Sequence, residues 1–150
     1  MKFRILIAIV LAFMVASTAS ADTDRLERLA DKIASEAVVR AHALARAPAA
    51  PAFAPPSGDP LLSDMQDFAL AAITLSNAIE ANEGPQDLRC IFRGMGRDIE
   101  TRITALMESE TRADQSRAYR EIERLARQAE RIAANPDAQV ASTPRCELPD

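Results

Sequence analysis

The sequence has few aromatic residues, few glycines and little sign of β-structure. Aromatic residues make up 4% of the 150 residues and tryptophan is absent, while alanine supplies much of the apolar content. No segment shows the strict polar–apolar alternation of a half-buried strand. We therefore predict an all-α protein whose core is built from small side chains and close helix contacts. The length is enough for one domain but not comfortably for two.

The groups that most enzymes and cofactor sites require are also scarce. The one histidine, His42, is predicted to point away from the apolar face of its helix and to be solvated. There are no Glu-x-x-His pairs for a carboxylate-bridged metal and no Cys-x-x-Cys-His for haem. Gly94-Met95-Gly96 lacks the third glycine and the preceding strand of a phosphate loop. We expect neither enzymatic activity nor a metal or cofactor.

The first 21 residues have the layout of a secretory signal peptide. Lys2 and Arg4 form a positive start, Ile5–Ala16 is an uninterrupted run of twelve apolar residues, and Ala19-Ser20-Ala21 is a small-residue cleavage site. The alternative is an uncleaved membrane anchor. Twelve helical residues rise about 18 Å, which is short of a hydrocarbon core of about 30 Å. We predict cleavage after Ala21 and a single mature domain, residues 22–150.

The mature chain is acidic and carries little lysine. Loss of Lys2 and Arg4 from the 18 basic residues leaves 16 against 22 acidic ones, a net charge of −6. This balance does not favour binding to nucleic acid or to anionic membranes. Lys32 is the only mature lysine, and a high arginine and alanine content is typical of GC-rich bacterial genomes. We expect a periplasmic or secreted protein that has no membrane contact after cleavage.

Cys90 and Cys146 are the only cysteines. In an oxidising compartment an even number of cysteines indicates disulfides, and two allow one intramolecular pairing. Closing a loop of this length stabilises a protein by about 4 kcal/mol in the chain-entropy model. Metal binding by two cysteines without a nearby histidine is disfavoured. We predict one disulfide, Cys90–Cys146.

Helical periodicity and stop signals divide the mature chain into four helices. Asp59-Pro60 is a typical helix start, Gly84-Pro85 a typical stop, and Thr111-x-x-Asp114 resembles a capping box after the polar stretch that begins at Glu108. Prolines make 47–60 a Pro/Ala-rich linker, and 135–150 is a C-terminal tail. The predicted helices are 22–46, 61–83, 85–107 and 112–134.

The connections and charges predict a bundle. Short turns make the second, third and fourth helices antiparallel neighbours. The linker could span about 40 Å if extended, the length of the first helix, so the first and second helices could run parallel. Residues 59–83 carry five acids and no base, whereas 111–134 carry six arginines and four acids. We therefore expect the second and fourth helices to attract one another.

The third predicted helix has two distinct faces. Its apolar residues share one side, and Gly94 and Gly96 flank Met95, which predicts close packing of a second backbone. Cys90 lies on the opposite side, where a C-terminal tail could reach it. The apolar side comprises Leu88, Ile91, Phe92, Met95, Ile99, Ile103 and Leu106.

A row of arginines is the main candidate binding site. Arg89, Arg93 and Arg97 are spaced by four residues and share one side of the helix, where like charges repel unless acidic groups answer them. Either acids of the first two helices or of the tail pair with the row, or the row binds an anion or an acidic partner. Two functions remain open. One is protein–protein contact, with an unknown partner or with a second copy, and the other is binding of a small anion.

Overall fold

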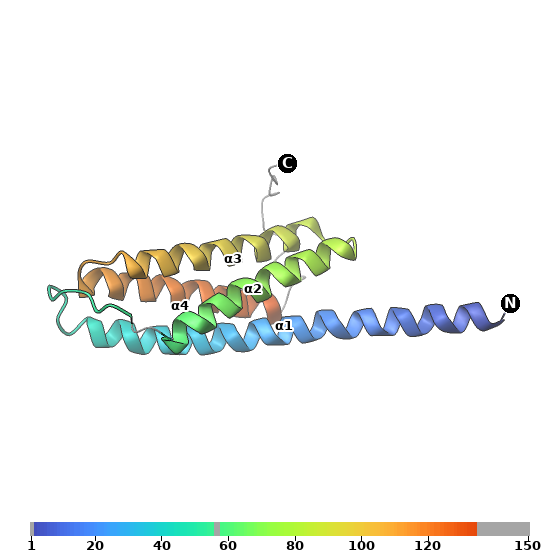
Figure 1. Ribbon diagram of the computed structural model, residues 1–150, viewed down its shortest axis with the longest axis horizontal. Helices are drawn as coiled ribbons and strands as arrows, with labels where there is room; N and C mark the ends of the chain where they lie inside the picture. The colour runs from blue at the N-terminus through green and yellow to red at the C-terminus, as the bar shows by residue number, and fades with distance from the viewer. Residues whose placement is uncertain (1, 56–57, 135–150) are drawn as a thin grey trace.

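Four helices form a bundle in the computed structural model, which describes residues 2–55 and 58–134, with side chains from residue 21 onward. Over these residues there is no strand, and the predicted all-α class is confirmed. Figure 1 shows the helices lying side by side, with α1 the longest. The helices are α1 (Lys2–Leu44), α2 (Pro60–Ala81), α3 (Gln86–Met107) and α4 (Arg112–Ala134).

The predicted helix starts are confirmed by their capping contacts. Asp59 is the N-cap of α2, and its carboxylate accepts a hydrogen bond of 2.9 Å from the Leu61 amide, with Pro60 in the first turn. Thr111 precedes α4, where its hydroxyl oxygen accepts from the Asp114 amide at 3.2 Å and its hydroxyl donates to the Asp114 carboxylate at 2.6 Å. The predicted break between the third and fourth helices is therefore correct.

The turn between α2 and α3 uses a left-handed residue. Glu83 has a φ of 53°, and the Gly84 amide donates a hydrogen bond of 2.8 Å back to the Ile79 carbonyl. A Cβ on Gly84 would lie 2.9 Å from the Ile79 side chain. The turn closes on the end of α2 so tightly that only glycine fits at this position.

The first helix begins earlier than predicted. It starts at Lys2 and continues without a break into the segment that was predicted to start at Asp22. Apolar signal segments favour helix as well, so this continuity does not decide whether the chain is cut after Ala21, and cleavage stays a prediction. In the described part of the chain, no helix combines the length and the apolar character needed to cross a membrane.

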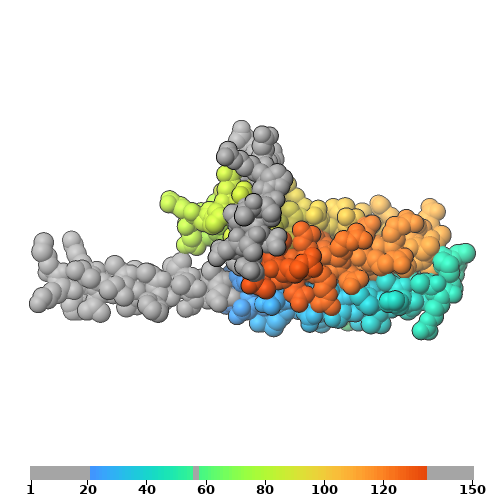
Figure 2. Space-filling model, turned by 180° about the vertical axis from the view of Figure 1, so that it is seen from behind, coloured from blue at the N-terminus to red at the C-terminus, as the bar shows by residue number. Residues whose placement is uncertain are grey.

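Adjacent helices are antiparallel all around the bundle. On α1 and α4, Ser116 Oγ donates to the Ala41 carbonyl at 3.0 Å, and Arg127 pairs with Asp31 at 3.0 Å, so one sequence number falls as the other rises. Between α2 and α3, Ser76 Oγ donates a hydrogen bond of 2.9 Å to the Arg89 carbonyl. Figure 2 shows α4 lying along α1.

A parallel arrangement of the first two helices is wrong. Arg40 contacts Asp59 and Lys32 contacts Asp64, so α2 starts beside the last turns of α1 and runs back along it. The linker does not span the bundle because its proline-rich segment folds against the turn between α3 and α4. The bundle is therefore closed at one end by the linker and that turn together.

Backbone hydrogen bonds fix the linker in this position. Ala52 donates to the Glu110 carbonyl, Arg112 donates to Ala50, and Ala113 donates to Pro48, each at 2.9–3.0 Å. A single antiparallel bridge joins Pro51 to Thr111. A segment rich in proline has few amides of its own to satisfy, so it presents carbonyls that the exposed start of α4 uses.

The expected attraction between the second and fourth helices is not realised. Each packs against α1 and α3, and in the described residues no Cα atom of α2 comes within 8 Å of α4. The acids of α2 pair instead with bases of α1 and α3, and Arg127 of α4 pairs with α1. Apolar faces decide which helices meet, and surface charge pairs contribute too little to change that choice.

Small residues bring the helices of the core together. A Cβ on Gly96 would lie 3.0 Å from Ile73 Cγ1 and 3.2 Å from the Ala69 carbonyl oxygen, which confirms the predicted close packing of α3 on α2. Gly94 meets nothing within 4 Å, so the prediction fails there. The largest fully buried apolar side chains are Leu26, Ile33, Leu61, Met65, Phe68, Ile99, Leu106 and Ile122.

Candidate functional site

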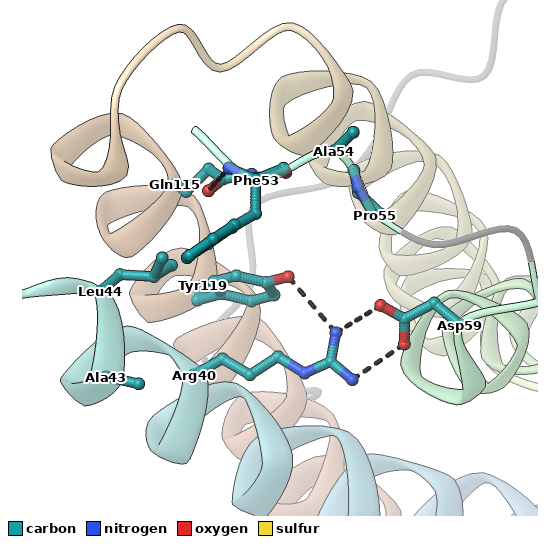
Figure 3. Close-up of a pocket in the computed structure, with 9 residues that line it drawn as sticks. All are labelled: Arg40, Ala43, Leu44, Phe53, Ala54, Pro55, Asp59, Gln115 and Tyr119. Carbon is teal, nitrogen blue, oxygen red and sulfur yellow. Dashed lines mark hydrogen bonds and ion pairs between the residues drawn. The ribbon is translucent and has the colours of Figure 1, made fainter. Parts of the chain in front are cut away.

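A mostly apolar cavity of about 210 Å³ lies at the end of the bundle that the linker closes. The last turns of α1, the linker and the first turns of α4 each contribute side chains to it, and the start of α2 forms part of its polar side (Figure 3). The lining residues are Arg40, Ala43, Leu44, Phe53, Ala54, Pro55, Asp59, Gln115 and Tyr119.

Arg40 forms the polar side of this cavity and joins three helices. Its two terminal nitrogens bind the two oxygens of Asp59 at 2.5 and 2.8 Å, in the forked geometry that suits a guanidinium. Its Nε donates to Glu36 one turn earlier at 2.8 Å. A longer contact of 3.5 Å reaches the hydroxyl of Tyr119 on α4, whose ring lies 5.8 Å from the guanidinium carbon.

Both charges of this pair are held firmly in their ionised forms. Hydrogen bonding to Arg40 lowers the pKa of Asp59, against a desolvation effect that would raise it, and the Leu61 amide lowers it further. The same contact raises the pKa of Arg40 above its ordinary value. The Asp59 side chain is only 3% exposed. A buried carboxylate that is so fully paired cannot serve as a base near neutral pH.

Phe53 stands at the edge of the cavity, and a side chain of α4 binds its backbone. Gln115 binds the Phe53 backbone twice: its side-chain oxygen accepts from the Phe53 amide at 2.9 Å, and its side-chain nitrogen donates to the Phe53 carbonyl at 2.5 Å. The guanidinium of Arg112 lies 4.1 Å from the ring centroid. Phe53 is nevertheless 57% exposed.

One carboxylate partly neutralises the charge of the predicted arginine row. Glu80 of α2 binds Arg89 at 2.7 Å and Arg93 at 3.3 Å, so an acid of the second helix does face the row. Glu80 is half exposed, and water screens both pairs. Arg97 is exposed and, over the residues that the structure describes, has no acidic oxygen within 4.0 Å. The row thus presents three guanidinium groups to one carboxylate.

The predicted disulfide cannot be placed. Cys146 lies outside the described residues, so the bond stays a prediction. Cys90 is half-buried near the start of α3 and takes part in an interaction of its own. His42 is exposed, as predicted, beside Arg120 and Glu123. In the described residues no group of three or more histidine, cysteine or acidic side chains could hold a metal ion.

Sequence reasoning did not identify the cavity. Asp59 was recognised as a helix cap, but its pairing with Arg40 depends on how the linker folds. Phe53, the one aromatic residue of the linker, is expected from the sequence to enter a pocket, but it lines the edge of the cavity and is 57% exposed. Tyr119 is the only tyrosine, and its position on α4 carried no separate signal.

Comparisons with known proteins give no identity for this bundle. No protein-family model, curated protein sequence or solved structure matches the chain.

Proposed function

We propose that this protein is exported to the periplasm and acts there by binding another protein rather than by catalysis. The signal-like residues 1–21 support export, and the acidic mature chain argues against nucleic acid as the partner. A second copy of the chain is one candidate for the partner.

The observation that carries the proposal is the exposed Phe53 beside the apolar cavity. Aromatic anchors and apolar recesses are the features that dominate the energetics of protein interfaces. The exposed Phe53 and the apolar cavity lie at the same end of the bundle. Phe53 belongs to a linker segment that backbone hydrogen bonds hold in place. Hydrogen bonds that already hold a surface segment in place reduce the conformational entropy that the segment loses on binding.

A test places a photo-crosslinking amino acid at residue 53 in cells that express the protein. Residue 81, exposed at the far end of α2, serves as the matched control. We expect a discrete adduct from position 53, identified by mass spectrometry, and none of that mass from position 81. The same adducts from both positions, or none from either, would overturn the proposal.

We also propose the Cys90–Cys146 disulfide. Because α3 and α4 are antiparallel, α4 ends at Ala134 on the end of the bundle where α3 begins. The twelve residues from there to Cys146 can span roughly 40 Å, which is ample for reaching Cys90. Mass mapping of the unreduced protein from the periplasm should find the two peptides joined, and Cys146→Ser should abolish that species. Two free thiols in the exported protein would refute the bond.

Small-anion binding at Arg89, Arg93 and Arg97 is the second candidate function. The excess of three guanidinium groups over one carboxylate favours it. Against it, Arg89 and Arg93 already bind Glu80. A ligand-dependent rise in melting temperature across a panel of anionic metabolites, lost in Arg93→Ala/Arg97→Ala, would support this function over protein contact.

Export is tested separately by N-terminal sequencing. The proposal predicts that the mature chain begins at Asp22, and a mature chain that retained Met1 would refute cleavage.

A further inference from the structure

The chemistry of the cavity at the linker end restricts what can occupy it. The two charged groups in its wall, Arg40 and Asp59, bind one another twice, and Arg40 also binds Glu36. Among the lining residues a charged occupant would meet no unpaired opposite charge, and it would lose its hydration on entry. The wall of the cavity therefore favours an uncharged occupant.

The size of the cavity restricts the occupant further. A volume of about 210 Å³ exceeds the roughly 150 Å³ of an apolar cavity that holds benzene, and it falls below that of most sites for drug-sized ligands. One ring or one branched aliphatic group fits. Ala43, Leu44, Ala54 and Pro55 supply apolar contacts, and the Phe53 ring can stack on the occupant.

Among the described residues, the Tyr119 hydroxyl is a polar group of the wall that can still donate its proton. The Tyr119 hydroxyl oxygen accepts from Arg40, and in the described residues its own proton meets no acceptor. Figure 3 shows this hydroxyl on the inner side of the cavity, next to the guanidinium. An occupant that carries a carbonyl oxygen would complete the hydrogen bonding of this group.

We propose that the cavity receives a single phenylalanine or leucine side chain of a partner protein, with a backbone carbonyl of that partner accepting from Tyr119. This assignment rests on the proposed function in protein binding, and it names the feature that the partner must present. The proposed Cys90–Cys146 disulfide would hold the chain's own tail at the opposite end of the bundle, where α4 ends and α3 begins, so the tail is a poor occupant.

Binding of an apolar side chain in the cavity can be measured without knowing the partner protein. Tyr119 is the only tyrosine and tryptophan is absent, so tyrosine fluorescence of the purified full chain reports on this cavity alone. The probes are the N-acetyl amides of phenylalanine, leucine, alanine, glutamate and lysine, which share one backbone. We expect saturable changes from the phenylalanine and leucine amides at concentrations about tenfold or more below those for the others, because only these two bury a large apolar group.

Two variants provide the control. Ala43→Phe places a ring in the cavity from an exposed position on α1, and Ala81→Phe adds the same ring at an exposed site far from it. Ala43→Phe should abolish the response and Ala81→Phe should leave it unchanged. Equal responses to all five amides, or a response that survives Ala43→Phe, would overturn the assignment.

Failure of this assignment is distinguishable from failure of the proposed function. A crosslinked partner at residue 53 together with no amide response would keep protein binding and remove the cavity as the anchor point. An amide response without any crosslinked protein would keep the cavity as a site for an apolar group and refute protein binding there.

Discussion

Arginines at the two ends of the bundle are used in opposite ways. At the linker end, Arg40 is bound to Asp59, Glu36 and Tyr119, and the Asp59 side chain is 3% exposed. At the other end, Arg89 and Arg93 share a single carboxylate, Glu80, which is 50% exposed. One arrangement is a saturated junction of three helices, whereas the other is a solvated cluster with excess positive charge.

The difference shows that charge density alone does not mark the better candidate site. The arginine row stands out in the sequence, but its interactions are exposed and screened by solvent. The single Arg40 is inconspicuous in the sequence, yet its pairing removes all net charge from an apolar cavity. Neutralising the wall in this way makes the cavity suited to an uncharged occupant.

The largest expected effect comes from breaking the Arg40–Asp59 pair. Asp59→Asn keeps a good N-cap but loses the charge, so it isolates the ion pair. We expect the free energy of unfolding to fall by about 2–3 kcal/mol, below the cost in a fully buried pair because Arg40 keeps Glu36 and part of its hydration. Urea denaturation measures the loss. Asp67→Asn, an exposed site on the same helix, should change stability by less than about 0.5 kcal/mol.

The same pair predicts how stability depends on pH. The pKa of Asp59 is lower in the folded protein than its ordinary value of 3.8, so the ionised pair contributes fully above that value. As pH falls below it and through the lower folded pKa, the contribution is lost. The stability difference between the natural protein and Asp59→Asn should therefore shrink from neutral pH towards about pH 2 in parallel urea titrations. A difference independent of pH would show that the charge of Asp59 does not stabilise the fold.

Substitutions at Gly94 and Gly96 test how closely α3 packs against α2. This packing places the arginine row opposite Glu80. Gly96→Ala should destabilise the protein by about 1 kcal/mol, because its Cβ meets the fixed Ala69 carbonyl oxygen at 3.2 Å. Gly94→Ala meets nothing within 4 Å and should stabilise it by about 0.5–1 kcal/mol through helix propensity. Thermal unfolding of the two variants should give shifts of opposite sign. Shifts of the same sign would contradict the close contact of α2 and α3.

The smallest effect is expected at the arginine row itself. Glu80→Gln removes the shared partner of Arg89 and Arg93 and should cost about 0.5 kcal/mol or less, since both pairs are screened by water. Arg93→Ala/Arg97→Ala should likewise cost less than about 1 kcal/mol. A double variant that unfolds at room temperature would mean that the row is structural, and the contrast between the two ends of the bundle would then fail.

Local structure was predictable from this sequence to a large extent. The starts of α2 and α4 follow from Asp59-Pro60 and from Thr111 with Asp114, whose side chains satisfy amides that every helix start leaves free. The apolar side of α3 was also correct, with Phe92, Met95 and Ile99 buried. These signals act within one or two turns, so they need no knowledge of the fold.

The relations between helices were less predictable. The linker is long enough to span the bundle, but its backbone bonds to residues 110–113 keep it at one end, where α2 starts beside the last turns of α1. The cavity depends on that path, because Phe53 and Asp59 line the same cavity as Tyr119 only when the linker folds over the start of α4. The charges of α2 and α4 suggested a contact that the apolar faces do not allow.

The most direct test combines crosslinking with the cavity variants. A photo-crosslinking residue at position 53 is introduced into the natural chain, into Ala43→Phe and into Ala81→Phe, and adducts are compared in intact cells. We predict one discrete protein adduct in the natural chain and in Ala81→Phe, with a loss of at least tenfold in Ala43→Phe. An adduct of equal intensity in all three chains would show that the cavity does not receive the partner and would contradict the account.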